Sequence, residues 1–304
     1  MSRPYAILDV FTNQALAGNP LAVVLEADRL DDAAMQKIAA EFNLSETVFV
    51  FSARNPAHSA SIRIFTPARE LPFAGHPTVG TAILLASDRF GEVEKAQDAM
   101  VVLEEKVGPV RCGVKLTPKA AGFAEFDAPR ISKPVGISLG DKAEVATALN
   151  LNSVDIGFEN HHPSTFEAGV PFAFVPIGGL DALARARPNL AAWVDALGDG
   201  DHNNAFLYCR DTRNHRTTFR ARMFAPEMGI TEDPATGSAA AAFAGVIRTF
   251  DKPTDGTHFI RVEQGFEMGR PSLIDLEIDI EGNELGAIRI GGQAVIVARG
   301  ELFV

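Results

Sequence analysis

The segment Arg63-Ile64-Phe65-Thr66-Pro67, followed by Gly75-His76-Pro77-Thr78-Val79-Gly80-Thr81-Ala82, decides the fold because the chain repeats it. The second copy reads Arg222-Met223-Phe224-Ala225-Pro226 and then Glu232-Asp233-Pro234-Ala235-Thr236-Gly237-Ser238-Ala239. Arg63 and Arg222 lie 159 positions apart (222 − 63), and Pro77 and Pro234 lie 157 apart (234 − 77), so a two-residue deletion separates the blocks. A repeat at about half the chain length predicts two similar lobes, which face each other across a ligand cleft.

Further segments repeat in the same order. Gly18-Asn19-Pro20-Leu21-Ala22-Val23-Val24 matches Gly169-Val170-Pro171-Phe172-Ala173-Phe174-Val175, and Phe49-Val50-Phe51 matches Phe206-Leu207-Tyr208. Several matching pairs in one order indicate an internal duplication of the whole lobe.

Composition narrows the class of protein. The chain has 304 residues, 46% of them apolar, with a formal charge of −11. This length predicts about two domains, and the acidic excess argues against a nucleic-acid or anionic-membrane partner. No signal peptide is recognisable at the start, and the longest apolar stretch, 239–247, is too short to span a membrane, so we expect a cytoplasmic protein. Cys112 and Cys209 both lie in strand-like text, which predicts packing rather than chemistry.

The order of elements predicts an α+β fold with two pseudo-symmetric lobes, each a curved, mostly antiparallel sheet around a central helix. We expect the first lobe at 1–118, which the last strand at about 294–304 can rejoin, and the second at 119–293. The stretch 118–134 carries Pro, Gly and Ala without periodicity and is the expected linker. Expected helices include 32–42, capped by Asp31 or Asp32, and single segments at 142–149 and 181–197. The two central helices are expected from Pro77 to about Ala86 and from Pro234 to about Ile247.

The starts of the two central helices are candidate ligand sites. A proline in the first helical turn costs no hydrogen bond, so His76 and Asp233 become candidate N-cap residues in equivalent places. We expect Gly80 and Gly237 in the first turns, where a ligand can approach the backbone, and Ser238 is the equivalent of Thr81. Free N–H groups at such turns bind anions, so the two starts together could hold a small carboxylate. Plain capping by Asp233 and a hydrogen-bonded structural His76 are the competing interpretations.

Glu46 stands at the mouth of the apolar strand Thr47-Val48-Phe49-Val50-Phe51. It could be a solvated strand-end charge. Facing a closed cleft, it could instead be a general base whose proton affinity is raised by desolvation. The matching region Asn203-Asn204-Ala205-Phe206 has no carboxylate, so the lobes have diverged around one base.

Competing chemical motifs are missing from the sequence. It contains no Walker-type phosphate loop, no His-Glu-x-x-His and no Cys-x-x-Cys. We therefore expect no metal site.

The combined motifs resemble the PhzF family, the phenazine-biosynthesis isomerase-like proteins. The resemblance rests on Asp9-Val10-Phe11-Thr12, Leu44-Ser45-Glu46-Thr47, Leu71-Pro72-Phe73-Ala74-Gly75-His76-Pro77-Thr78, Glu232-Asp233-Pro234-Ala235-Thr236-Gly237-Ser238 and Gln264-Gly265-Phe266-Glu267-Met268-Gly269-Arg270-Pro271-Ser272. It covers almost the whole chain.

The resemblance implies a diaminopimelate epimerase-like fold, a homodimer and no cofactor. In the family pattern Glu46 matches the catalytic acid/base. His76, Asp233 and Ser238 match residues that hold the substrate and assist proton movement, and Gly75 and Gly237 match backbone donors. The wider superfamily of racemases has a cysteine pair at the helix starts. Here those places hold His76 and Asp233, which disfavours a two-thiol reaction.

The expected function is a cofactor-independent isomerase that moves a proton on a small carboxylate-bearing substrate between the lobes. Three alternatives stay open: an epimerase or racemase that uses Glu46 and Asp233 on opposite faces, a non-catalytic metabolite-binding protein, and, as the weakest, a hydrolase that uses Ser238. The motifs do not name the substrate, because specificity lies in the lining of a cleft. The stretch 159–165 and Arg63 or Arg222 are candidates for specificity, although strand-end ion pairs are the favoured interpretation of both arginines.

Overall fold

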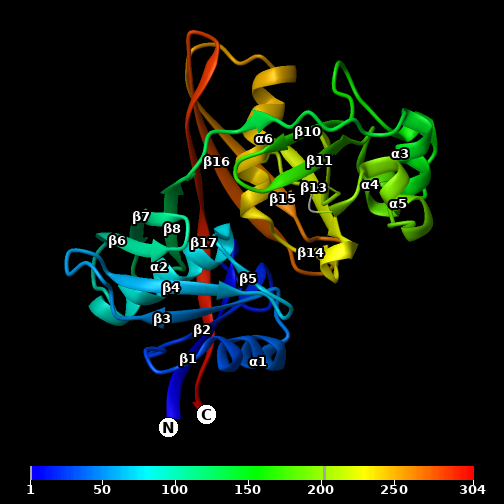
Figure 1. Cartoon of the computed structure of the whole chain (residues 1–304). Helices are drawn as coiled ribbons and strands as arrows, with labels where there is room; N and C mark the ends of the chain where they lie inside the picture. The colour runs from blue at the N-terminus through cyan, green and yellow to red at the C-terminus, as the bar shows by residue number, and fades with distance from the viewer. Residues whose placement is uncertain (1, 201–202) are drawn as a thin grey trace. The chain divides into compact units, whose positions relative to one another are not determined.

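Figure 1 shows the computed structural model of the chain, which describes residues 2–200 and 203–304. The chain divides into two compact units. Unit 1 comprises 1–127 and 291–304, and unit 2 comprises 128–290.

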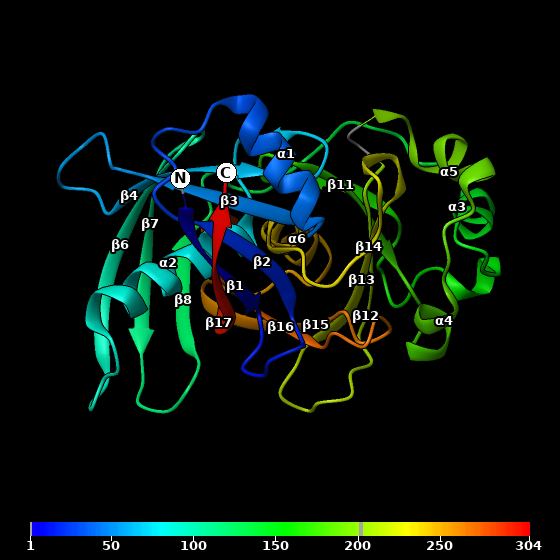
Figure 2. The ribbon, with the colours of Figure 1, turned by 90° about the horizontal axis from the view of Figure 1, so that it is seen from below.

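Unit 1 is a mixed sheet that covers one long helix. Its elements are β1 (Ser2–Val10), β2 (Asn19–Val24), α1 (Asp32–Phe42), β3 (Glu46–Phe51), β4 (Ala60–Phe65), β5 (Glu70–Leu71), α2 (Gly75–Phe90), β6 (Gln97–Glu105), β7 (Gly108–Leu116) and β8 (Gly122–Asp127). β2 and β3 are parallel, as are β4 and β6, whereas β1–β2, β3–β4, β6–β7 and β7–β8 are antiparallel. The end of β17 (Glu284–Phe303) runs antiparallel to β1, as Figure 2 shows. α2 contacts strands at both ends of this order, including β1, β2, β6, β7 and β8, and is therefore the centre of the unit.

The sequence specifies α1 through its cap and its apolar face. Asp31 is the N-cap, and its side chain accepts a hydrogen bond from the backbone N–H of Ala34 at 2.7 Å. Met35 and Ile38 lie on one face of the helix and pack into the core of unit 1. Asn43 ends the helix in the left-handed conformation. The expected helix and its cap are confirmed.

Unit 2 is built around α6 (Gly237–Phe250). Its other elements are β9 (Lys133–Pro134), α3 (Lys142–Ala148), η1 (Ser153–Asp155), β10 (Ser164–Glu167), β11 (Pro171–Pro176), α4 (Leu180–Arg185), α5 (Leu190–Leu197), β12 (Ala205–Cys209), β13 (Phe219–Ala225), η3 (Pro226–Met228), β14 (Ile230–Asp233), β15 (Gly256–Gln264) and β16 (Ser272–Glu281). β11–β12 and β13–β15 are parallel, whereas β10–β11, β12–β13 and β15–β16 are antiparallel. α6 contacts β9, β10, β11 and β16.

The core of unit 2 has two parts. Around α6, the ring of Phe243 packs against Phe174, Tyr208 and Phe219 with centroids 4.7–5.7 Å apart. The second part lies beneath α3, α4 and α5, which gather together in Figures 1 and 2. Trp193 is its largest side chain, and its indole N–H donates to the backbone oxygen of Asn203 at 3.1 Å.

Three expected elements are corrected by the structure. The stretch 118–134 contains the boundary between the two units, at 127/128, as expected of a linker, but it also contains the strands β8 and β9. The helical segment 181–197 is broken into α4 and α5, since Pro188 cannot donate a backbone hydrogen bond within a helix. α6 begins at Gly237 rather than at Pro234.

The duplication seen in the sequence is repeated in strand pairing. β4 pairs with β6 in parallel through Ala60↔Leu103, and β13 pairs with β15 in parallel through Phe219↔Val262. Both partners of the second pair lie 159 positions after those of the first (219 − 60, 262 − 103). Among the described residues no helix is long and apolar enough to cross a membrane.

Candidate active site

Glu46 and His76 come together in unit 1. Glu46 is the first residue of β3, and His76 is the second residue of α2. The Oε2 atom of Glu46 lies 3.4 Å from Nε2 of His76, and their side chains are only 13% and 5% exposed. Glu46 is therefore not a solvated strand-end charge.

His76 is a neutral imidazole at physiological pH. Burial lowers its pKa from 6.5 to about 3, because an imidazolium in the interior would lose its hydration. Its buried Nε2 makes no hydrogen bond of good geometry with the described part of the chain. A buried polar atom in this condition is unusual and marks His76 as a candidate functional group.

His76 is not the N-cap of α2, contrary to the expectation from the sequence. The N-cap is Ala74, which makes no side-chain capping bond, and Gly75 is the first helical residue. Pro77 is accordingly the third helical residue. It is tolerated there because the first-turn N–H groups have no partner within the helix.

Asp233 is likewise not an N-cap. It is the last residue of β14, and the N-cap of α6 is Thr236. The Thr236 hydroxyl donates to Oδ2 of Asp233 at 2.6 Å instead of capping the helix. Asp233 is only 6% exposed, so its carboxyl group is buried and oriented by Thr236.

The predicted backbone donors occupy helix starts. Gly75 and Gly237 are the first residues of α2 and α6, where backbone N–H groups lack helical acceptors. Ser238 follows Gly237 and is partly exposed. Gly80 was expected to admit a ligand, but it lies beyond the first turn. A Cβ there would approach Leu21 and Val10 within 2.6 and 2.8 Å, so this glycine serves packing.

Glu105 and Gln264 are two buried polar residues that no sequence motif marked as site residues. They are the last residues of β6 and β15, and both are buried. Glu105 continues the inward positions of Val101 and Leu103, and Gln264 continues those of Ile260 and Val262. A polar residue in an inward position of a strand was the signal that could have revealed them.

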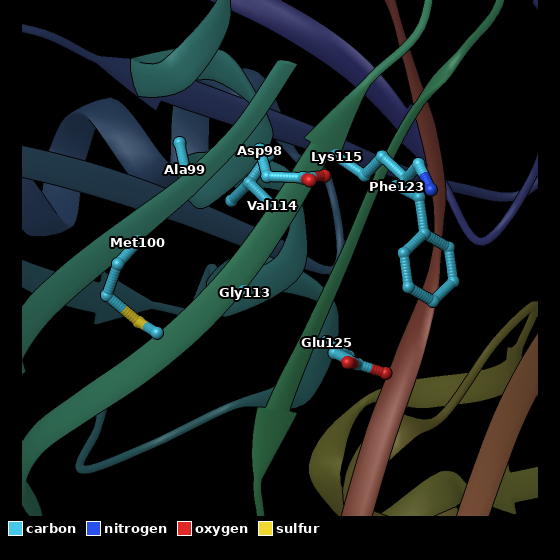
Figure 3. A pocket seen from close by; sticks show the side chains of 8 residues that line it. All are labelled: Asp98, Ala99, Met100, Gly113, Val114, Lys115, Phe123 and Glu125. Atoms are coloured by element: carbon cyan, nitrogen blue, oxygen red, sulfur yellow. The ribbon is translucent and has the colours of Figure 1, made fainter. Parts of the chain in front are cut away.

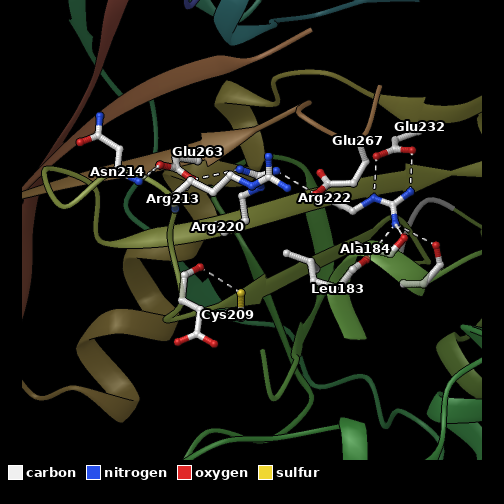
Figure 4. Close-up of polar contacts among 12 residues, drawn as sticks. Leu183, Ala184, Cys209, Arg213, Asn214, Arg220, Arg222, Glu232, Glu263 and Glu267 are labelled. Carbon is white, nitrogen blue, oxygen red and sulfur yellow. Dashed lines mark hydrogen bonds and ion pairs between the residues drawn. The ribbon is translucent and has the colours of Figure 1, made fainter. Parts of the chain in front are cut away.

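Arg63 and Arg222 form the same ion pair in the two units. Arg63 donates to both carboxylate oxygens of Glu70 at 2.8 Å. Arg222 donates in the same way to both oxygens of Glu232 at 2.8 Å, as Figure 4 shows. The favoured interpretation of these arginines as strand-end ion pairs is confirmed.

His161, in the stretch 159–165, is a fully engaged histidine. Its Nδ1 lies 2.9 Å from the Tyr208 hydroxyl, and its Nε2 lies 2.8 Å from Oδ1 of Asp251. These contacts tie the stretch to β12 and to the end of α6, so His161 has a structural role.

The cysteines are buried, as expected, and burial raises the pKa of both thiols, that of Cys209 to about 12.

A hollow of about 440 Å³ between β6, β7 and β8 is lined by Met100, Gly113, Phe123 and neighbouring residues (Figure 3). It contains none of the predicted site residues. Within the described ranges no group of three or more His, Cys, Asp or Glu side chains is arranged to hold a metal ion.

Known proteins resemble this chain over its full length. The family model for phenazine biosynthesis-like proteins, PhzC-PhzF, matches residues 8–300. An uncharacterized isomerase of Mesorhizobium japonicum is 50% identical, over 100% of this chain and 99% of its own. The trans-2,3-dihydro-3-hydroxyanthranilate isomerase of Pseudomonas fluorescens is 34% identical, over 98% of each chain. The crystal structure of a PhzF-family phenazine biosynthesis protein from Bacillus anthracis superposes with a TM-score of 0.86 at 27% identity and covers 100% of both chains.

The resemblance inferred from the motifs is confirmed by the family model, by isomerases and by a solved structure. Since the match extends through both units, it concerns the whole chain rather than a shared segment. The chain therefore belongs to the PhzC-PhzF family of phenazine biosynthesis-like proteins and is an enzyme of the isomerase class.

Proposed function

We propose that this isomerase moves a proton between carbons of a small carboxylate-bearing substrate, without a cofactor and with Glu46 as the acid/base. The pair of Glu46 and His76 carries the proposal, because Oε2 and Nε2 lie 3.4 Å apart with both side chains largely buried. A shielded carboxylate has lost hydration that would weaken it as a base, and a positioned base is what proton transfer from carbon requires.

The neutral state of His76 favours this role for Glu46. An imidazolium at 3.4 Å would hold the carboxylate in an ion pair and make it a weaker base, whereas a neutral ring does not. The neutral ring can also donate a hydrogen bond to an oxygen on which charge develops, and can exchange a proton with the substrate.

The substrate carboxylate is proposed to bind backbone N–H groups at Gly75 and Gly237, together with Ser238. First-turn N–H groups and the positive end of the helix dipole favour an anion. Asp233 is proposed to bind the substrate or take part in proton transfer, since the hydroxyl of Thr236 orients its carboxyl group at 2.6 Å. We also propose that the active enzyme is a homodimer, as the family resemblance implied.

A single base suits proton migration along one face of the substrate, because the same carboxyl group can remove the proton and return it. Inversion at one carbon needs acid and base on opposite faces, and Asp233 would then be the second group. Reaction in deuterated water separates these cases. Migration places deuterium at a new carbon, whereas epimerisation places it at the original carbon with inverted configuration.

The variant Glu46→Gln tests the proposal. An amide cannot accept the proton, so turnover is expected to fall by roughly 10²–10⁴-fold. Binding of a carboxylate ligand, measured by calorimetry, is expected to persist. The substrate named for the relative in Pseudomonas fluorescens, trans-2,3-dihydro-3-hydroxyanthranilate, is the first probe. Glu94→Gln, at an exposed site, is the control. Unchanged turnover in Glu46→Gln would remove Glu46 from the mechanism.

A further inference from the structure

Glu105 and Gln264 occupy one and the same position in the two units. Each is the last residue of a nine-residue strand, β6 or β15, and they lie 159 positions apart (264 − 105). This is the offset that relates the parallel pairings of β6 with β4 and of β15 with β13. The two side chains are 8% and 0% exposed.

In unit 2, Gln264 holds the segment between β14 and α6. Its Nε2 donates to the backbone oxygen of Asp233 at 2.8 Å and to the hydroxyl of Thr236 at 3.0 Å. Its Oε1 accepts from the backbone N–H of Thr236 at 3.1 Å, which fixes the orientation of the amide. The Thr236 hydroxyl in turn donates a hydrogen bond to Oδ2 of Asp233. Gln264 therefore positions the Asp233 carboxyl group indirectly, through Thr236.

In unit 1, Glu105 reaches the equivalent segment at the start of α2. Its Oε1 lies 2.7 Å from the hydroxyl oxygen of Thr78, which also lies 2.8 Å from the backbone oxygen of Ala74. A hydroxyl has one hydrogen, and the backbone oxygen of Ala74 can only accept. Both contacts are hydrogen bonds at once only if Thr78 donates to Ala74 and a protonated Glu105 donates to Thr78.

The surroundings of Glu105 favour the protonated form. Desolvation raises its pKa from 4.5 to about 8, against the opposing effect of the Thr78 hydrogen bond. Thr78 faces it from α2, and the thiol of Cys112 on β7 is close enough for the two groups to affect each other. Arg54, Arg63, Glu70 and Lys106 line the same hollow of about 370 Å³. Arg63 and Lys106 are both paired with Glu70, at 2.8 and 3.5 Å, so their charge is already compensated.

We propose that Glu105 and Gln264 are equivalent positioning residues, Glu105 for the start of α2, which bears His76, and Gln264 for the segment before α6, which bears Asp233. We also propose that Glu105 acts as a neutral carboxylic acid. A protonated carboxyl group offers a donor beside an acceptor, as the amide side chain does with its two donor hydrogens, so both units use a neutral side chain that can donate. This inference rests on the proposed function for its catalytic consequence. A neutral Glu105 also makes the conformation of the start of α2 depend on pH, because an ionised Glu105 can no longer donate a hydrogen bond to Thr78.

The first test needs no variant and no substrate. Infrared spectra of the folded protein should contain the carbonyl band of a buried protonated carboxylic acid at pH 6, and this band should disappear as the pH rises through about 8. In Glu105→Gln the band should be missing from pH 6 upward, while the exposed control Glu94→Gln should keep it. A wild-type spectrum without such a band at pH 6 overturns the proposal, whether or not the Glu46 mechanism is right.

The second test exchanges the two side-chain types by means of the variants Glu105→Gln and Gln264→Glu. The wild type is expected to lose kcat as the pH rises above about 8. Glu105→Gln should keep kcat at pH 7 and lose this alkaline decline. Gln264→Glu cannot supply both donor hydrogens, so kcat should fall about tenfold or more at pH 8 and recover in part at low pH, with KM less affected. An alkaline limb that survives in Glu105→Gln, or a Gln264→Glu variant with unchanged kcat at all pH values, overturns the positioning role.

Discussion

Glu104 and Glu263, which lie 159 positions apart (263 − 104), accept the same backbone hydrogen bonds from equivalent loops of the two units. Glu104 accepts backbone hydrogen bonds from Arg54 and Asn55 at 2.9 and 2.8 Å. Glu263 accepts them from Arg213 and Asn214 at 3.3 and 3.0 Å (Figure 4). Every donor and acceptor of the second set lies 159 positions after its counterpart. The duplication is therefore visible in this set of hydrogen bonds as well as in the apolar core.

Glu263→Gln is expected to destabilise the protein much more than Glu104→Gln. Glu263 is fully buried and also accepts from the guanidinium of Arg220 at 3.0 Å, which would lose a charged partner in the interior. Breaking a buried ion pair costs roughly 3–5 kcal/mol when the remaining charge has no other partner, and Glu267, which lies 2.8 Å from Arg220, reduces that cost here. Glu104 is bonded mainly by backbone N–H groups near the surface, and an amide oxygen can still accept one of them. Chemical denaturation of both variants checks the difference, and equal shifts in midpoint would contradict it.

The sequence predicted those features that depend on local patterns. The repeated blocks predicted the internal duplication, and Asp31 with Met35 and Ile38 predicted α1 and its cap. Glu46 and His76 were identified by type and family pattern, and the structure brings them to 3.4 Å. The catalytic roles of these residues stay proposals.

The predicted first residues of the two central helices were wrong, because residues distant in the sequence determine where these helices begin. Asp233-Pro234 is a typical helix beginning, yet the Thr236 hydroxyl and the Gln264 side chain, 28 positions further along the chain, hold this segment in another conformation. In unit 1, Ala74 is the N-cap without a capping side chain, so no local signal marks the boundary. Glu105 escaped notice for the same reason, since its partner Thr78 lies 27 positions away.

Replacing Arg222 with methionine should cost more stability than the same change at Arg63. Arg222 is 2% exposed, and besides Glu232 it donates to the backbone oxygens of Leu183 and Ala186, both at 2.8 Å. The variant leaves Glu232 and these carbonyls without a donor, a loss of roughly 3–5 kcal/mol. Arg63 has a 27% exposed side chain, and water can replace it at a cost of about 1 kcal/mol. Urea unfolding of the two variants measures the contrast, and a larger loss at Arg63 would count against it.

In His76→Gln the free energy of unfolding should fall less steeply than in the wild type as the pH is lowered. The pKa of His76 is about 3 in the folded state and 6.5 when unfolded, so the unfolded chain binds more protons between these values. The stabilisation is complete above pH 6.5 and is lost as the pH falls toward 3, by roughly 5 kcal/mol at most. Glu104, whose pKa is lowered to about 2, mainly by backbone hydrogen bonds, changes stability only below its unfolded value of 4.5. Glu105, with a pKa raised to about 8, contributes with the opposite sign between pH 4.5 and 8, but equally in both proteins. The difference in slope between the variant and the wild type from pH 6.5 to 4.5 therefore reports His76, and equal slopes would show that it is not buried as a neutral ring.

Gly265→Ala should impair both stability and turnover, because the loop after β15 packs directly on the backbone that precedes α6. Gly265 has φ +76°, and a Cβ there would lie 2.4 Å from the backbone oxygen of Arg270 and 2.6 Å from that of Pro234. The backbone must shift, and Pro234 directly follows Asp233, so the proposed substrate-binding carboxyl group moves with it. Gly269→Ala in the same loop is the matched control, since it has φ +70° but nothing within 4 Å of its Cβ. The control should lose only about 1 kcal/mol from its left-handed conformation and keep its kcat. Equal effects of the two variants on kcat would show that the contact with Pro234 does not position Asp233.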